Sequence, residues 1–230
     1  MKHLSIFGDS ILKGVVLNPK NLRYQNSNDF DLEALFSEYG FVLNNQSRFG
    51  CTIGKGLTMM RRQLERNAPC DIAIIELGGN DSNFHWDEVA AEPDKEHLPA
   101  TPLDVFKRLY GKMIDELTAA GIYPVLATLP PLCAERYLDW ITKDGLSKAN
   151  ILSWLGDANA IYRYQERYSH VIGELVREKG CAFIDLRKTF LSRLHLHDYY
   201  CRDGIHPNGA GQRLILDSLR EGLSSIAPVI

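Results

Sequence analysis

Short apolar runs alternate with longer segments of helical periodicity along this chain. The clearest run covers residues 71–77, where Ile, Ala and Leu side chains follow one another around a single glutamate. A continuous run of this kind indicates a strand that is buried on both faces, as in the centre of a parallel sheet. Five segments are predicted to be strands: residues 2–7, 41–44, 71–77, 123–129 and 181–186.

Segments with apolar residues at helical spacing separate the predicted strands. Gly40, Gly121 and Gly180 follow three of these segments, and glycine commonly ends a helix. Helices are predicted at residues 30–39, 57–66, 102–120, 158–179 and 209–223. The alternation of strands and helices favours one parallel sheet with helices on both faces.

Four stretches have no clear period. Residues 17–28 are rich in Asn and are predicted to be a loop, and residues 82–102 are predicted to be an acidic surface excursion. Residues 132–157 are expected to form short helices. Residues 189–201 are expected to be irregular or partly helical.

The composition is that of an ordinary globular protein, with 45% hydrophobic and 24% charged residues among 230. This length predicts one domain. The net charge of −3 and the lack of a basic block argue against nucleic acid or an anionic membrane as a partner. No apolar run approaches the roughly 18 residues of a membrane span. The N-terminus leads directly into the first predicted strand, so we expect no signal peptide.

The cysteines are five in number and show no C-x-x-C spacing. We therefore expect reduced thiols in a cytoplasmic protein, without a disulfide framework or a zinc site. His195 and His197 have a spacing that can bind a metal on one strand face, but no third ligand is evident. We expect neither a metal nor a cofactor.

Glycines and polar residues follow the predicted strands at one edge of the sheet. Gly8-Asp9-Ser10 comes after the first strand and before a segment expected to start a helix. Gly50 follows the second strand, and Gly78-Gly79-Asn80 follows the third. The turn at residues 203–206, with Asp203 and His206, precedes the last helix. Because the carboxyl ends of parallel strands share one edge, these segments are expected to be neighbours.

Each of these residue types suits acyl transfer. Ser10 would attack an acyl carbon, His206 would take and return the proton, and Asp203 would hold the imidazole tautomer. The amides of Ser10 and Gly50, with the side chain of Asn80, would surround the oxyanion. Gly54 or Gly56 are alternatives to Gly50, which is preferred because it follows the strand at the shortest reach.

The four segments together resemble the sequence blocks of the SGNH (GDSL-type) hydrolases. The resemblance implies a flavodoxin-like three-layer α/β/α fold with a five-stranded parallel sheet, and hydrolysis of esters or thioesters. It implies Ser10, Asp203 and His206 as the triad, with Gly50 and Asn80 as oxyanion donors. One domain would span residues 1–230, with insertions at about 82–101 and 132–157 compared with compact members. The G-x-S-x-G elbow of α/β-hydrolases is absent.

Plainer interpretations exist for several residues. Asn80 and Asp81 suit an Asx-type turn, and Asp81 is expected to be structural. Glu76 lies in a buried strand and is expected to be structural rather than catalytic. Cys51 adjoins Gly50 but has no histidine assigned to it, so we expect a packing role. The predicted substrate contacts are Asp9, Trp86 and Trp140, although aromatic residues in long loops are as often the core of a lid.

The first functional hypothesis is serine-dependent hydrolysis of a short acyl ester, such as an O-acetyl group on a carbohydrate or small molecule. The alternatives with the same triad are a long-chain thioesterase or lysophospholipase, and an acyltransferase. A ligand-binding module without turnover is the hypothesis from another class, and the complete set of reactive residues argues against it. The sequence indicates no oligomeric state.

Overall fold

A five-stranded parallel sheet forms the centre of the computed structural model, which describes residues 1–226. Residues 227–230 of the expected domain lie outside this range. The strand order is β4-β1-β5-β6-β7. The strands are β1 (Lys2–Gly8), β4 (Phe41–Asn45), β5 (Ile72–Glu76), β6 (Tyr123–Ala127) and β7 (Ala182–Ile184).

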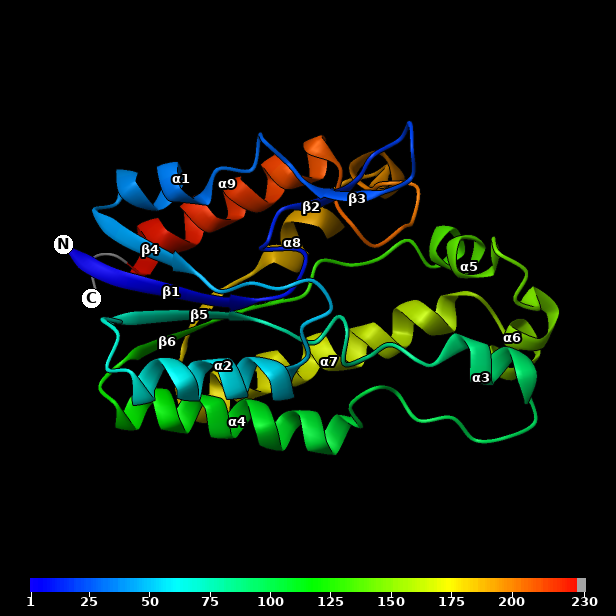
Figure 1. The fold of residues 1–230 in the computed structure, drawn as a ribbon, viewed down its shortest axis with the longest axis horizontal. Coiled ribbons are helices and arrows are strands. Elements are labelled where there is room, and N and C mark those ends of the chain that lie inside the picture. Colours follow the sequence, from blue (N-terminus) through cyan, green and yellow to red (C-terminus); the bar gives the residue numbers. More distant parts are fainter. Residues whose placement is uncertain (227–230) are drawn as a thin grey trace.

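Helices cover both faces of this sheet. One face packs against α1 (Leu32–Glu38), α8 (Leu186–Leu191) and α9 (Gly209–Ile226). The other packs against α2 (Ile53–Glu65), α4 (Leu103–Ala119) and α7 (Asn159–Lys179). Figure 1 shows α1 and α9 above the sheet and α2 and α4 below it. The expected flavodoxin-like three-layer fold is confirmed.

The central strand β5 explains why its sequence run is apolar throughout. Ile72 and Ile74 point into the core beneath α1 and α9, whereas Ala73 and Ile75 point into the core beneath α2 and α4. All four side chains are at most 1% exposed. Both faces of the strand are therefore buried, as the pattern predicted.

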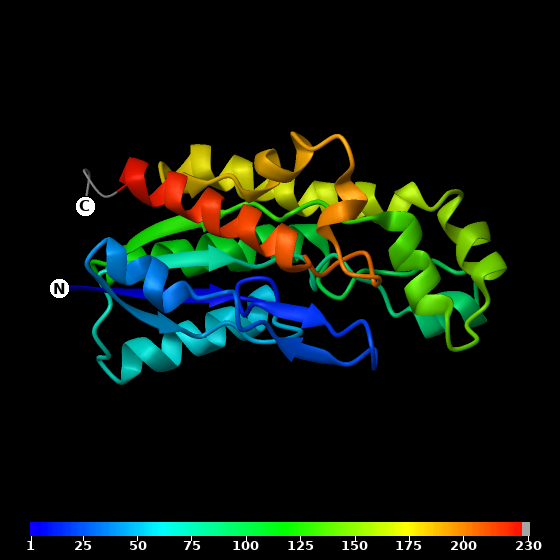
Figure 2. The same cartoon turned by 90° about the horizontal axis from the view of Figure 1, so that it is seen from above.

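Three further helices lie beyond the carboxyl ends of the strands. They are α3 (Trp86–Ala91), α5 (Ala134–Thr142) and α6 (Lys148–Leu155). With the start of α7 they enclose a separate apolar cluster that includes Trp86, Tyr137 and Ile151. Figures 1 and 2 show this group at one end of the molecule, away from both termini. The short helices expected in residues 132–157 are present, and residues 82–102 include a helix that the sequence did not indicate.

Several local predictions were wrong. Residues 17–28 do not form only a loop, because β2 (Val15–Leu17) and β3 (Tyr24–Asn26) pair as an antiparallel hairpin. The exposed, polar side chains of β3 hide this pairing from a search for apolar runs. The last strand ends at Ile184, and α8 begins two residues later. The second long helix begins at Ile53 instead of residue 57.

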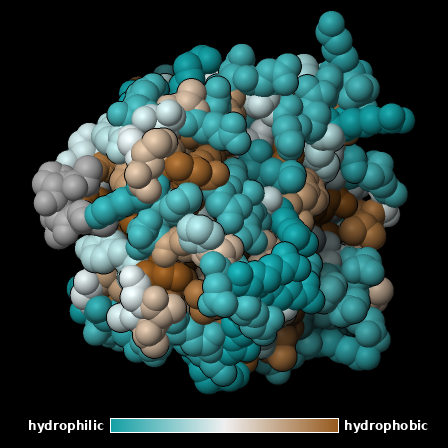
Figure 3. Space-filling model, turned by 60° about the vertical axis from the view of Figure 1, so that its left-hand side comes forward, coloured by the Kyte–Doolittle hydropathy of each residue, from teal (hydrophilic) through white to brown (hydrophobic). Residues whose placement is uncertain are grey.

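A membrane span requires a long helix with apolar character along its length. No helix within residues 1–226 is both long and apolar enough to cross a bilayer. The face drawn in Figure 3 is mostly hydrophilic, with its apolar residues in small separate patches.

The early start of α2 depends on a buried carboxyl group. Both oxygens of Asp81, which is fully buried, accept the backbone N–H of Ile53 at 3.1 and 3.0 Å. This N–H is one of the unpaired donors at the helix start, where a carboxylate is also favoured by the helix dipole. Burial nevertheless raises the pKa of Asp81 to about 6. Asp81 therefore joins the loop after β5 to the start of α2.

This pKa predicts how Asp81→Asn changes the pH dependence of stability. A carboxyl group whose pKa is higher in the folded protein than in the unfolded chain contributes stability at low pH and loses it as pH rises. For Asp81 the loss occurs between pH 3.8 and about 6. The asparagine keeps an acceptor for Ile53 but does not titrate. We expect the free energy of unfolding of the variant, relative to that of the wild type, to increase between pH 4 and pH 8 by up to roughly 3 kcal/mol. Urea unfolding at the two pH values measures this difference. If the unfolding free energies of variant and wild type differ by the same amount at both pH values, the raised pKa of Asp81 is contradicted.

Candidate active site

Ser10 lies just beyond the carboxyl end of β1. Gly8 ends the strand, and residues 10–14 form successive turns that lead into β2, so the expected helix after Ser10 is absent. The backbone N–H of Val15 donates to the carbonyl of Ser10 at 2.9 Å and fixes the turn. The serine is 7% exposed, so its hydroxyl faces an enclosed space.

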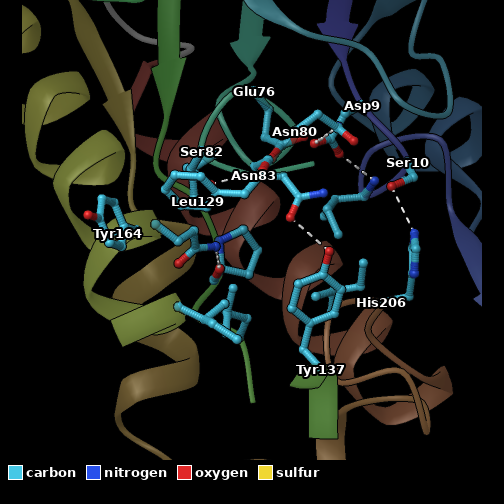
Figure 4. Close-up of a pocket in the computed structure, with 18 of the residues that line it drawn as sticks. Asp9, Ser10, Glu76, Asn80, Ser82, Asn83, Leu129, Tyr137, Tyr164 and His206 are labelled. Carbon is cyan, nitrogen blue, oxygen red and sulfur yellow. Dashed lines mark hydrogen bonds between the residues drawn. The ribbon is translucent and has the colours of Figure 1, made fainter. Parts of the chain in front are cut away.

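Ser10, His206 and Asp203 form a line of hydrogen bonds. The Nε2 atom of His206 lies 2.9 Å from the Ser10 hydroxyl oxygen, and its Nδ1 atom lies 2.6 Å from Asp203 Oδ2. Figure 4 shows the contact between serine and histidine. A carboxylate beside Nδ1 requires the proton on that atom, which leaves Nε2 to accept the serine proton. The arrangement has the geometry of a serine–histidine–aspartate triad.

The loop that carries Asp203 and His206 is held in place by its own backbone and by α5. Asp203 Oδ1 accepts the backbone N–H groups of Ile205 and His206 at 3.2 and 3.1 Å. Gly204 has a φ of +76°, and a Cβ there would lie 2.7 Å from the carbonyl oxygen of Cys133. The N–H of Cys133, the residue before α5, donates to the Gly204 carbonyl at 2.8 Å. A glycine is therefore required where this loop contacts α5.

Asn80 connects the other two segments. Its side-chain Nδ2 donates to Asp9 Oδ2 at 3.0 Å and to the Cys51 carbonyl at 3.1 Å. The N–H of Arg48 also donates to the Gly8 carbonyl at 3.1 Å. These bonds hold the loop that contains Gly50 next to both Asn80 and the end of β1.

The structure distinguishes among the three candidate glycines. Gly50 has a φ of +66° and open space beside its Cα atom. Gly54 and Gly56 lie inside α2, and the N–H of Gly56 donates to the carbonyl of Thr52. Gly56 also packs against Leu77, where a Cβ would collide. Only Gly50 of the three is in a loop, which favours Gly50 as the oxyanion donor.

Two buried carboxyl groups lie beneath this site. Asp9 accepts the N–H of Ile11 at 2.8 Å as well as Asn80, and burial raises its pKa to about 6. Glu76 is fully buried, and neither of its carboxyl oxygens has a hydrogen-bond partner among the described residues. Burial and the neighbouring Asp9 raise the pKa of Glu76 well above its usual range. A protonated Glu76 is the form that this environment favours.

A cavity of about 90 Å³ extends from Ser10 and His206 into the protein. Asp9 and Trp86, two of the three predicted substrate contacts, line it; the oxygens of Asp9 already accept hydrogen bonds from the protein. Figure 4 shows the lining converging from several elements. Further lining residues come from separate elements, so no pattern in the sequence indicated them: Asn83, Leu129, Ile161, Tyr164 and Ile205.

Trp140 lies outside the cavity, in an aromatic cluster on the other side of His206. The ring of Tyr24 lies 4.9 Å from the imidazole, and the ring of Phe49 is stacked on it at 5.8 Å. Trp140 meets Tyr24 edge-on at 6.3 Å. Tyr24 and Phe49 are 38% and 53% exposed, whereas His206 is 2% exposed. These rings cover the histidine and present an apolar surface to solvent.

The other residues considered from the sequence have structural surroundings. His195 and His197 lie at a short 3₁₀ helix (Leu196–Tyr199) and not on a strand face, as the metal interpretation required. No group of three potential metal ligands occurs among the described residues. All five cysteines lie in the described part of the chain and are free thiols.

The family model for GDSL-like lipases and acylhydrolases matches residues 6–214. The chain belongs to this family. The sequence matches no curated protein at a significant level. The hydrolase resemblance is thus confirmed at the level of the family, which is one of ester hydrolases.

Solved structures share the fold along nearly their whole length. A lipase/acylhydrolase from Enterococcus faecalis is 17% identical, with a TM-score of 0.66 over 98% of this chain and 96% of that one. An esterase from Pseudoalteromonas sp. is 18% identical, with a TM-score of 0.61 over 98% of each chain. An acetyl xylan esterase is 20% identical, with a TM-score of 0.63 over 96% of this chain and 99% of that one.

The surroundings of Cys51 predict that its thiol is unreactive. Burial raises the pKa of Cys51 to about 11, so little thiolate exists at pH 8. Mass spectrometry after iodoacetamide treatment should find Cys51 unmodified in the folded enzyme and modified in urea. Cys51→Ala should keep ester turnover within about threefold, because the catalytic geometry does not use the sulfur atom. Loss of turnover in Cys51→Ala, with turnover kept in Ser10→Ala, would indicate a thiol nucleophile instead.

Proposed function

We propose that this protein hydrolyses short acyl esters through an acyl-enzyme formed on Ser10. The observation that carries the proposal is the hydrogen-bonded line from Asp203 through His206 to Ser10, which ends at the mouth of a small cavity. A nucleophile, its base and the group that orients the base are all within hydrogen-bond distance. The free thiols are compatible with the cytoplasm, which stays our proposed compartment.

The reaction would proceed in two halves. Ser10 Oγ attacks the acyl carbon while His206 Nε2 takes the hydroxyl proton, and a tetrahedral oxyanion forms. Collapse breaks the bond to the alcohol oxygen, which receives the proton from Nε2. Water then attacks the acyl-enzyme with the same proton transfers and releases the carboxylic acid and free Ser10. Asp203 stabilises the imidazolium in both halves.

Asn80 is the proposed side-chain donor to the oxyanion, together with the amides of Ser10 and Gly50. In the free protein its two amide hydrogens are directed at Asp9 and Cys51. One of them would turn to the oxyanion when the tetrahedral intermediate forms. This hydrogen bond to the oxyanion would exist only in the transition state and the intermediate. It would therefore stabilise the transition state more than the bound substrate.

The size of the cavity supports a short acyl group. A cavity of about 150 Å³ in an apolar protein core can hold a benzene molecule. The cavity beside Ser10 has about 90 Å³, so it fits an acyl chain of about two to four carbon atoms. A long-chain thioester or lysophospholipid needs more room than this. Release of the acyl group to an acceptor other than water remains an alternative that product analysis tests.

The aromatic cluster supports a carbohydrate as the alcohol part. The leaving oxygen must approach His206 Nε2, and the open surface beyond the histidine is formed by Tyr24, Phe49 and Trp140. Aromatic rings with a polar rim suit the C–H faces of a sugar ring, whose hydroxyls stay in water. One of the structures with this fold is an acetyl xylan esterase, which agrees with an acetylated sugar.

The nucleophile is tested by Ser10→Ala with p-nitrophenyl acetate, butyrate and octanoate. We expect the wild type to prefer acetate or butyrate, and the variant to lose at least about a thousandfold in kcat/KM on every ester, because the covalent route is removed. The thermal midpoint of the variant, measured in parallel, reports whether it is folded. Wild-type protein that neither cleaves these esters nor reacts with a serine-directed phosphonate would refute the proposal and favour a binding module.

Phe49→Ala tests the alcohol side. It removes an exposed ring, so we expect KM for an acetylated xylose to rise about three- to tenfold more than KM for ethyl acetate, which has a small alcohol. Any effect of uncovering His206 falls on both esters and cancels in this comparison. Leu98→Ala is the matched control, since Leu98 is an exposed apolar residue away from the cluster. An equal effect of Phe49→Ala on both esters would contradict sugar stacking.

A further inference from the structure

The catalytic cavity has two ends, and the far end is lined by aromatic rings. Ser10 and His206 form one end, and Tyr164 lies at the other, as Figure 4 shows. Tyr164 comes from the first turns of α7. A substrate acyl group that starts at Ser10 and extends into the cavity therefore runs toward Tyr164.

An open groove of about 1070 Å³ lies behind this ring. Among the described residues, Tyr164 is the one side chain that lines both the cavity and the groove. The lining of the groove combines apolar residues such as Trp154, Leu155 and Val171 with charged residues such as Lys107 and Glu174. A groove of this composition suits an alkyl chain lying along its floor.

Packing keeps the Tyr164 ring in place. Phe84 meets it edge-on at 4.9 Å, and Trp154 is stacked at 6.4 Å with an angle of 13° between the rings. The guanidinium of Arg167 lies 5.5 Å from the ring centre. Aromatic and cation contacts of this kind each contribute about 0.5–1.5 kcal/mol. The ring is thus a fixed wall and not a freely rotating side chain.

We propose that Tyr164 sets the upper limit of acyl chain length by separating the catalytic cavity from the groove behind it. The inference rests on the proposed ester hydrolysis and adds the residue that determines its specificity. Removing the ring joins the two spaces and allows an acyl chain of about eight carbon atoms to pass from Ser10 into the groove. The limit depends on the ring and not on the phenolic hydroxyl.

The experiment compares Tyr164→Ala with the wild type on p-nitrophenyl butyrate and octanoate. Each methylene group that becomes buried is expected to raise kcat/KM by roughly fourfold. We therefore expect the octanoate-to-butyrate ratio to rise at least about tenfold in the variant, through a lower KM for octanoate. Tyr164→Phe, which keeps the ring, should have the wild-type ratio.

Tyr162→Ala is the matched control. Tyr162 is also a half-buried tyrosine near the start of α7, with Arg187 5.0 Å from its ring centre, but it lines neither space. General loosening of α7 would lower turnover of both esters in both variants. A change of the ratio in Tyr164→Ala alone supports the proposal. An unchanged ratio in Tyr164→Ala, or a wild type that already prefers octanoate, overturns it.

Binding of octanoate separates this proposal from the proposed hydrolysis. Trp86 lines the cavity and not the groove, whereas Trp154 lines the groove. In a Trp154→Phe background, a change in fluorescence therefore reports a chain that enters the cavity rather than one that binds in the groove from solvent. We expect octanoate to quench the fluorescence saturably in Tyr164→Ala and not in the protein that keeps Tyr164. This result would support the role of Tyr164 as the barrier between the two spaces, even for a protein that cleaves no ester. Identical titrations of the two proteins refute it. Failure of every ester with a positive titration would refute the hydrolysis alone.

Discussion

The fully buried Asp203 carboxyl group is the constraint on which the site depends. A buried carboxylate is costly unless donors surround it. The loop supplies three: the N–H groups of Ile205 and His206, and the imidazole of His206. Satisfying this carboxylate also fixes the imidazole with its other nitrogen toward Ser10. The turn of the loop in turn requires Gly204, whose φ is +76°. One electrostatic requirement thus determines the backbone, the tautomer and the direction of proton transfer.

The helices beyond the sheet serve this site in two ways. The start of α5 contacts Gly204 and braces the loop that carries His206. The same helices form an apolar cluster of their own, from which Trp86 and Tyr137 reach the cavity. A cluster that is packed against itself needs little support from the sheet, so it can close one end of the cleft without disturbing the parallel strands. Residues 82–101 and 132–157 therefore lie where they shape the substrate space.

The periodic parts of the chain were predictable. The five strands, the long helices and the common edge for Ser10, Asn80 and His206 follow from apolar runs and from the geometry of parallel sheets. Every residue of a central strand is buried, so such a strand requires consecutive apolar residues that can be recognised in the sequence. The hairpin of residues 15–26 was not predicted, because its second strand is exposed and polar and its pairing depends on backbone hydrogen bonds. The start of α2 was not predicted, because Asp81, which accepts the first N–H of the helix, is distant in sequence.

The sequence by itself therefore determined the family, the sheet and the residues of the candidate site, since these depend on local pattern and on strand order. Only the tertiary structure decided which residues surround them. It put Trp86 in the cavity and Trp140 outside it, brought Tyr24 and Phe49 onto His206, and made Tyr164 a wall between two spaces. Such contacts join side chains from separate elements whose meeting depends on how loops and helices pack. The spacing of apolar and polar residues along the chain does not predict these contacts.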